Sequence, residues 1–269
     1  MRVRGWQTHE LSVDGGRLRK RYVSWDRGEH EREWAVLTLL ARYAPGLAPA
    51  PLAADLDADP PWVMMSVLPG SPLGSGPLTA DQFDALETAL RRLWSVSVED
   101  LPARRLSLAE AVRSGSAKLA AVGRPDGVAG TAYDAAMDLV TGPELAELAR
   151  EEPPPVLGHS DPNLANYLWD GARIWVVDFE DAGRSDVAYE LATLVEHMAA
   201  RETDWTAFCA RFDVDPVRLR WCRQLCAAFW LYFLLRDRGS ARGNPPDVLE
   251  RQARRLLDLV DDRRARMPE

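Results

Sequence analysis

Four polar side chains that could take part in metal or acid–base chemistry lie close together in the stretch "GHSDPNLANYLWDGARIWVVDFED": His159, Asp161, Asn166 and Asp178. The Asp170-Gly171 pair between them is typical of a β-hairpin turn. Antiparallel pairing across a short loop places Asn166 opposite residues 175 to 177, with Asp178 at the same open end. His159 and Asp161 precede the first strand by a short loop, so we expect all four side chains to converge on one patch.

These residue types favour phosphate chemistry. The Asn166 amide and the Asp178 carboxylate offer hard oxygen ligands, which suit a Mg²⁺ ion that also bridges phosphate oxygens. Asp161 would then be placed to accept a proton. The alternative is a purely structural turn, but that interpretation leaves Asp178, directly after the apolar run "IWVV", without a reason for its charge. A metal-dependent hydrolase using His159, Asp161 and Asp178 is a second alternative, although further histidine ligands are lacking nearby.

The overall composition predicts a soluble protein of the cytoplasm. The 269 residues are 46% hydrophobic and 28% charged, and the net charge of −8 argues against nucleic acid as the main partner. The longest apolar run, Leu225 to Leu235, is too short to span a membrane, and the first residues show no apolar signal region. Three cysteines, an odd number, suit a reducing compartment, and Cys222 and Cys226 are predicted to be core thiols. A monomer or a homodimer is expected.

The first part of the chain predicts a small antiparallel sheet with one helix. Strands are expected at 8–13 and 17–25 around Gly15-Gly16, a helix at 28–43, and an apolar strand within 60–70. The helix should end before the proline-rich segment "APGLAPAPLA".

Within this part, Lys20 and Glu33 are the candidate ion pair. Strand alternation places Lys20 on the apolar face with Leu18 and Tyr22, and places Arg17, Arg19 and Arg21 on the other face. The helix carries Glu33 inside its apolar stripe: His30, Glu33, Trp34, Leu37, Leu40, Ala41 and Ala44. A carboxylate there needs a partner, and Lys20 is the obvious one.

The rest of the chain is mostly helical. Helical patterns cover 79–96, 107–122, 131–150, 215–238 and 246–265, with Asp215-Pro216 as a helix start. We therefore predict an α+β chain with an N-terminal lobe at 1–68 and a larger helical lobe at 69–269.

The motif "HSDPNLAN", followed after a hairpin by "VVDFE", resembles the aminoglycoside phosphotransferase family and its choline-kinase-like relatives. These are small-molecule kinases with a bilobal, protein-kinase-like fold. The resemblance extends over about residues 5 to 236 and is strongest between 156 and 200. It continues in "GRSDVAYELA", where Asp186 matches a family aspartate that supports the helix start and Glu190 replaces the usual aspartate.

The resemblance implies roles for individual residues. Asp161 is expected to be the catalytic carboxylate, and Asn166 and Asp178 the metal ligands, with His159 as a structural support. Lys20 and Glu33 would act on the phosphates of ATP or GTP, and the backbone of Ser66, Val67 and Leu68 would meet the purine. No G-x-G-x-x-G loop is present, and only Gly5 precedes the first predicted strand.

The acceptor is expected to be a small molecule. Asp186 follows Asp178 too closely for the activation segment of a protein kinase, and Ser160 stands where such an enzyme would have arginine. Between Asp178 and Asp204 the chain has eight acidic residues and only two arginines, Arg184 and Arg201, which predicts a cationic acceptor with Glu180 and Asp181 as its contacts. The family resemblance implies an aminoglycoside or another antibiotic as such an acceptor. A catalytically silent nucleotide-binding protein of the same fold is the alternative.

Overall fold

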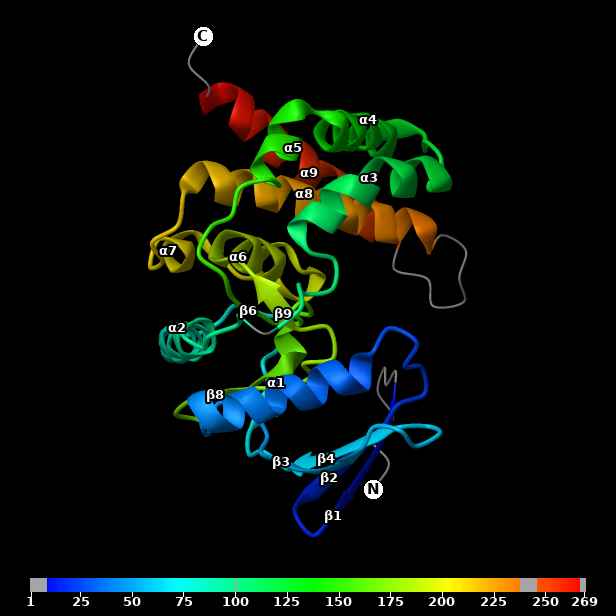
Figure 1. Ribbon diagram of the computed structural model, residues 1–269. Helices are drawn as coiled ribbons and strands as arrows, with labels where there is room; N and C mark the ends of the chain where they lie inside the picture. Colours follow the sequence, from blue (N-terminus) through cyan, green and yellow to red (C-terminus); the bar gives the residue numbers. More distant parts are fainter. Residues whose placement is uncertain (1–8, 100, 238–245, 267–269) are drawn as a thin grey trace. The chain divides into compact units, whose positions relative to one another are not determined.

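The computed structural model describes residues 9–99, 101–237 and 246–266 (Figure 1). Gly5 and the start of the first predicted strand lie outside them. By their contacts the residues form two compact units. The first comprises Met1–Arg105, Pro155–Asp186 and Glu202–Arg211, and the second comprises Leu106–Pro154, Val187–Arg201 and Phe212–Glu269. The predicted lobe boundary after residue 68 stays a prediction.

The first unit contains a four-stranded antiparallel sheet. Its strands are β1 (Glu10–Asp14), β2 (Arg17–Arg21), β3 (Pro51–Asp55) and β4 (Trp62–Ser66), in the order β1-β2-β4-β3. Gly15 and Gly16 both have positive φ, as the tight turn between β1 and β2 requires. The sequence analysis missed β3, because it begins within the proline-rich segment. Pro51 is tolerated there because β3 is an edge strand.

Helix α1 (Glu29–Tyr43) lies on one face of this sheet, in contact with β3 and β4 (Figure 1). Its buried face includes Glu33, as predicted, but Ala41 is exposed and Val36 is buried in its place. The buried face of α1 is therefore rotated around the helix toward Val36 relative to the predicted stripe. Glu33 still lies within this buried face.

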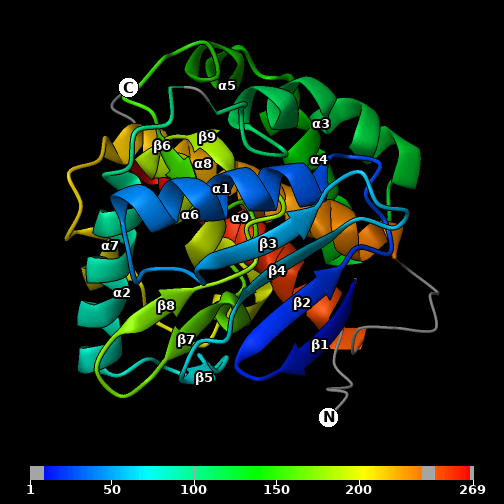
Figure 2. The ribbon, with the colours of Figure 1, turned by 60° about the horizontal axis from the view of Figure 1, so that its bottom comes forward.

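The motif stretch forms two short sheets in the same unit. Strands β5 (Ser71–Pro72), β7 (Tyr167–Trp169) and β8 (Ile174–Val176) lie side by side (Figure 2), and β6 (Val156–Gly158) pairs with β9 (Gly183–Ser185). The 3₁₀ helix η1 (Leu164–Asn166) precedes β7. The backbone N–H of Val177 donates to the carbonyl of Asn166 at 3.0 Å, so Asn166 faces the range that the hairpin register predicted. Helices α2 (Ala80–Trp94) and α7 (Thr206–Cys209) complete the unit.

The second unit is helical: α3 (Leu108–Val122), α4 (Gly127–Thr141), α5 (Pro143–Leu148), α6 (Val187–Glu196), η2 (Met198–Ala200), α8 (Pro216–Arg236) and α9 (Pro246–Arg266). Helix α8 contacts α3, α4, α6 and α9, and buries Cys222 and Cys226 among apolar side chains, as predicted. Asp215 caps α8 through the Val217 N–H, also as predicted.

The prediction of one helix over 131–150 is wrong. Pro143 restricts Gly142 to an extended conformation, so the chain leaves α4 and begins α5. Among the described residues, no helix combines the length and apolar character needed to cross a bilayer.

Candidate active site

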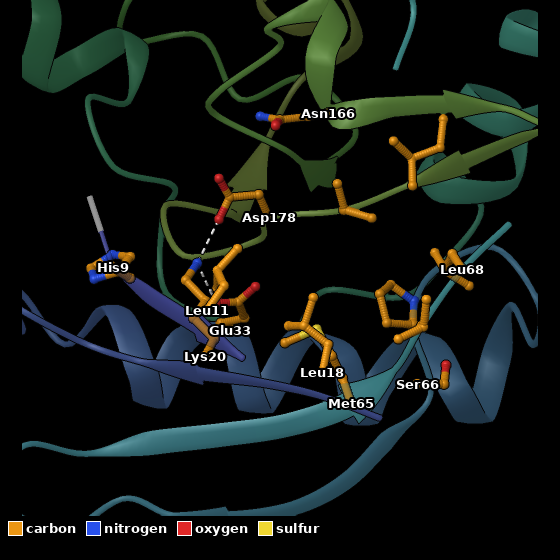
Figure 3. Close-up of a pocket in the computed structure, with 14 residues that line it drawn as sticks. His9, Leu11, Leu18, Lys20, Glu33, Met65, Ser66, Leu68, Asn166 and Asp178 are labelled. Atoms are coloured by element: carbon orange, nitrogen blue, oxygen red, sulfur yellow. Dashed lines mark hydrogen bonds and ion pairs between the residues drawn. The ribbon is translucent and has the colours of Figure 1, made fainter. Parts of the chain in front are cut away.

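Lys20 lies at the centre of a cluster of carboxylates (Figure 3). Its Nζ atom is 2.8 Å from Glu33 Oε2, 2.6 Å from Asp178 Oδ1 and 2.7 Å from Glu180 Oε2. Lys20 is 6% exposed and Glu33 is 1% exposed, so water hydrates neither side chain to any extent. The predicted Lys20–Glu33 ion pair is confirmed, and the same ammonium group also meets the predicted metal ligand Asp178.

The surrounding charges keep Lys20 protonated. Burial alone would lower the pKa of Lys20, but the negative charges of Glu33, Asp178 and Glu180 outweigh it and raise that pKa well above its ordinary value. Burial would also raise the pKa of Glu180, yet hydrogen bonding to His9 and the charge of Lys20 hold it at about 2. Lys20 is therefore protonated and Glu180 ionised at neutral pH.

Two residues of this cluster were missed from the sequence, Tyr22 and His9. The fully buried Tyr22 hydroxyl donates to Glu33 Oε2, and burial together with the Glu33 charge raises the pKa of Tyr22. Period-two alternation already placed Tyr22 beside Lys20, but an aromatic residue on an apolar face looks like ordinary core.

His9 lies directly before β1, with its ring centroid 4.7 Å from that of Tyr22 and its Nε2 atom 2.7 Å from Glu180 Oε2. Its Nδ1 atom accepts the backbone N–H of Val23 at 3.2 Å, which places the ring proton on Nε2, facing Glu180. No local sequence pattern links these two residues.

The catalytic-loop candidates also converge. The Asn166 amide Nδ2 donates to the Asp161 carbonyl at 2.9 Å and to Asp161 Oδ2 at 3.2 Å. His159 accepts the Asp161 backbone N–H at Nδ1, 3.3 Å away, and its Nε2 lies 2.7 Å from the Val177 carbonyl oxygen. With Nδ1 accepting, Nε2 must carry the proton that it donates. The ring thus connects the backbone beside Asp161 to the backbone beside Asp178.

Asp161 is mostly buried, and burial raises its pKa, assisted by the negative charge of Asp178. The backbone at Asp178 is in the left-handed region, with φ of 70°, as is that of Ser160, with φ of 73°. Such conformations are uncommon for residues with a Cβ and concentrate at functional sites. Both loops that carry candidate residues therefore hold a strained position.

The donor groups fit a divalent cation. Because the Asn166 NH₂ group is used by Asp161, the amide oxygen remains as the ligand atom. Carboxylate oxygens of Glu33, Asp178 and Glu180 lie within 4.8 Å of one another. The single positive charge of Lys20 cannot neutralise three carboxylates, and the excess negative charge favours a hard cation at this end of the site.

A cavity of about 330 Å³ opens beside the cluster. Its walls are largely apolar, while Lys20, Glu33, Asn166 and Asp178 form a polar end (Figure 3). The apolar lining comprises Leu11, Leu18, Pro49, Met65, Leu168 and Val177. This combination suits a ligand with a flat apolar part and an anionic part.

Ser66, Val67 and Leu68 line the same cavity. The Ser66 N–H donates to the Ala50 carbonyl at 2.9 Å, and the Val67 N–H donates to the Gly16 carbonyl at 3.0 Å. Among the described residues, no group accepts a hydrogen bond from the backbone N–H of Leu68. Of these three N–H groups, that of Leu68 is the one open to a ligand.

The remaining predicted residues are engaged with the chain itself. Glu180 contacts Lys20 and His9, and Asp181 Oδ2 lies 2.9 Å from Arg105 Nη1. Asp186 is buried directly before α6. The assignment of Glu180 and Asp181 to a cationic acceptor stays a prediction, but both carboxylates already have cationic or hydrogen-bonding partners.

Comparison with known proteins adds a family and a fold. The sequence model described as the phosphotransferase enzyme family matches residues 17–225. A search of curated protein sequences finds no match. Among solved structures, a choline/ethanolamine kinase family protein from Mesorhizobium loti has 17% identity and a TM-score of 0.63, covering 97% of this chain and 86% of its own.

Two further structures are similar. Choline kinase LicA from Streptococcus pneumoniae has 12% identity and a TM-score of 0.64, covering 97% of this chain and 92% of its own. A thermostable mutant of aminoglycoside phosphotransferase APH(4)-Ia, in ternary complex with ADP and hygromycin B, has 15% identity and a TM-score of 0.68, with the same coverage of 97% and 92%. The predicted α+β, kinase-like fold is confirmed.

Proposed function

Because the chain belongs to the phosphotransferase enzyme family, we propose that it transfers the γ-phosphoryl group of ATP or GTP, bound with Mg²⁺, to a hydroxyl group of a small molecule. The observation that carries this proposal is the Lys20 cluster. A buried ammonium, paired with a helix carboxylate and with Asp178, stands at the polar end of a cavity with apolar walls. This is the arrangement that positions nucleotide phosphates in protein-kinase-like enzymes.

The nucleotide is held from both ends of the cavity. The base lies between the apolar walls, and the Leu68 backbone N–H donates to its edge. At the other end Lys20 binds phosphate oxygens, and Glu33 keeps its ammonium group aimed at them. Asn166 and Asp178 would hold Mg²⁺, which neutralises the charge that develops on the phosphates.

Asp161 acts on the acceptor. Its carboxylate orients the hydroxyl group and accepts its proton while the oxygen attacks the γ-phosphorus, forming the new O–P bond as the bond to the leaving nucleoside diphosphate breaks. Asn166 and His159 fix the carboxylate and its backbone. A pKa raised by burial makes Asp161 a stronger base than an exposed aspartate.

The acceptor class is the less constrained part of the proposal. Aminoglycosides, other antibiotics and choline-like amino alcohols remain candidates because similar structures include aminoglycoside phosphotransferase and choline kinase proteins. Whether the reaction serves antibiotic resistance, and whether it takes place in the cytoplasm, stays a prediction.

A nucleotide-consumption screen with purified protein tests the proposal. ATP and GTP are supplied with Mg²⁺ over a panel of aminoglycosides, amino alcohols and neutral sugars, and products are identified by mass. Asp161→Asn is the matched control, since it keeps the shape of the side chain but removes the base. We expect it to keep Mg-nucleotide binding, seen by thermal shift, and to lose turnover by about 10² to 10⁴.

Three outcomes would contradict the proposal or one of its residue roles. A protein that Mg-nucleotide does not stabilise is not a kinase of this kind. Stabilisation without phosphorylated product from any acceptor would favour the catalytically silent nucleotide-binding protein. Product formation that survives Asp161→Asn at the wild-type rate would remove Asp161 from the reaction.

A further inference from the structure

Arg104 lies in the segment between α2 and α3 and is directed at the catalytic loop. Its side chain is buried, with the residue 4% exposed. The guanidinium group donates from Nε to Ser160 Oγ at 2.7 Å and from Nη2 to the Ser160 carbonyl oxygen at 3.1 Å. Ser160 is thus held by its side chain and by its backbone, from one rigid planar group.

Ser160 needs such support because of its backbone conformation. Its φ of 73° lies in the left-handed region, where the Cβ of any residue but glycine is crowded by its own backbone. Ser160 directly precedes Asp161, so the direction of the Asp161 side chain depends on this φ. A relaxed Ser160 would turn Asp161 away from Asn166.

The segment that carries Arg104 is itself fixed in place. The Arg104 N–H donates to the Arg184 carbonyl at 3.0 Å, and the Arg184 N–H donates to the Pro102 carbonyl at 2.8 Å. Gly183 allows this close approach, since a Cβ on it would lie 2.7 Å from both the Arg104 nitrogen and the Pro102 oxygen. The backbone of Arg104 is therefore hydrogen-bonded to β9, and its side chain extends from there to Ser160.

The same segment also contacts the helix of the Lys20–Glu33 pair. Arg32, the neighbour of Glu33 on α1, donates from Nη1 to the Ala103 carbonyl at 3.3 Å and to the Ala182 carbonyl at 3.1 Å. Two adjacent residues, Ala103 and Arg104, thus contact both α1, which carries Glu33, and the loop that carries Asp161.

We propose that Arg104 is a positioning residue that holds Ser160 in its left-handed conformation and thereby aims Asp161 at the acceptor hydroxyl. The inference rests on the proposed function, since it assigns Arg104 to the placement of the base. Nothing in it requires Arg104 to touch the nucleotide, so its loss should affect turnover and leave nucleotide binding intact.

The test uses the full-length protein with four variants: Arg104→Gln, Ser160→Ala, Ser160→Gly and the double variant Arg104→Gln with Ser160→Gly. Without Arg104, Ser160 should leave the left-handed region, and we expect kcat to fall at least about tenfold with the nucleotide KM within about twofold. Ser160→Ala, which loses one of the two bonds and keeps the Cβ, should fall a few-fold. Glycine occupies positive φ without support, so Ser160→Gly should restore most of the activity lost in Arg104→Gln.

A readout that needs no turnover separates this proposal from the proposed function. Amide hydrogen exchange of the peptide covering 156–166 should become faster in Arg104→Gln and return toward the wild-type rate in the double variant. Arg124→Gln, which removes an exposed arginine paired with Asp134, is the matched control and should change neither readout.

Unchanged kcat and unchanged exchange in Arg104→Gln would overturn the proposal. A loss that Ser160→Gly does not recover in either readout would show that Arg104 supports the fold in general and does not set this φ. If the wild-type protein phosphorylates nothing, the proposed function fails, and the exchange measurement still decides the role of Arg104.

Discussion

Replacing Tyr22 with phenylalanine removes a single oxygen atom from the centre of the Lys20 cluster. That oxygen donates a hydrogen bond to Glu33 Oε2, and both residues are almost fully buried. The ring stays in contact with His9 and His30, so packing is preserved. The variant therefore isolates one hydrogen bond to a buried carboxylate.

The expected cost follows from the charge of the acceptor. A hydrogen bond to a charged group contributes about 1.5 to 3 kcal/mol, whereas a neutral one contributes about 1 kcal/mol. Glu33 keeps its ion pair with Lys20 in the variant, which limits the loss. We expect the free energy of unfolding to fall by about 2 kcal/mol, and nucleotide affinity to fall several-fold because Glu33 can then turn away from Lys20.

Urea unfolding at pH 7 in the absence of nucleotide measures the first effect, and titration with Mg-nucleotide measures the second. Tyr43→Phe is the matched control, because Tyr43 lies on the same helix as Glu33 and is 54% exposed. It loses the same atom to solvent and should change stability by less than about 0.5 kcal/mol. If Tyr22→Phe costs no more than Tyr43→Phe, the hydroxyl does not hold Glu33 and the argument for Tyr22 fails.

Three further predictions concern other groups. Asp178→Ala should abolish the Mg²⁺-dependent part of nucleotide stabilisation in thermal-shift assays, whereas Asn166→Ala, which removes a neutral ligand, should only weaken it; a normal response of Asp178→Ala would refute the metal assignment. Lys20→Ala and Glu33→Ala should be non-additive in nucleotide affinity, and simple additivity in a double-mutant cycle would mean independent side chains. Burial lowers the pKa of His197 to about 4. Between about pH 6.5 and 4 the unfolded chain therefore binds a proton at His197, whereas the folded chain does not. Stability should therefore fall with pH between about 6.5 and 4, by about 2 kcal/mol at pH 5 relative to pH 7.5, and urea unfolding of His197→Gln should lack that loss.

The parts of the site that the sequence predicted are those set by local periodicity. Alternation along β2 turns Lys20 inward, the helical period turns Glu33 inward, and the hairpin turn sets Asn166 opposite Val177. Burial of two opposite charges then leaves pairing as the physically acceptable result. In each case the direction of the side chain is set by residues of its own strand, helix or hairpin.

The parts that it missed depend on contacts between distant segments. His9 meets Glu180, and Arg104 meets Ser160, through loops whose path no periodic pattern encodes. The left-handed backbone of Ser160 is likewise invisible in the sequence, because serine has no preference for positive φ. Strand β3 was missed for a different reason, since its proline-rich start has the composition of a loop and only its place at the sheet edge permits it.

The structure also changes the argument for a cationic acceptor, which relied on an open field of acidic side chains after Asp178. Three of those carboxylates are paired with cations from outside the stretch. Asp178 and Glu180 share Lys20, and Asp181 pairs with Arg105. A fourth, the fully buried Glu196, lies within 3.0 Å of arginine side chains on α8 and α9.

Paired charges produce little field at a distance, because each carboxylate and its cation form a dipole that solvent and salt screen further. At the Lys20 cluster three carboxylates still outnumber the one ammonium group, and Mg²⁺ bound there would neutralise that excess. An acceptor approaching the loaded enzyme would therefore meet far less negative potential than the sequence count indicates. We expect kcat/KM for any acceptor, charged or neutral, to change by less than about threefold between 25 and 300 mM salt, since steering by a strong field would change it far more. A steep fall of kcat/KM with salt for a cationic acceptor, together with an unchanged kcat/KM for a neutral one, would contradict this reasoning. It would mean that the acidic stretch does attract the acceptor.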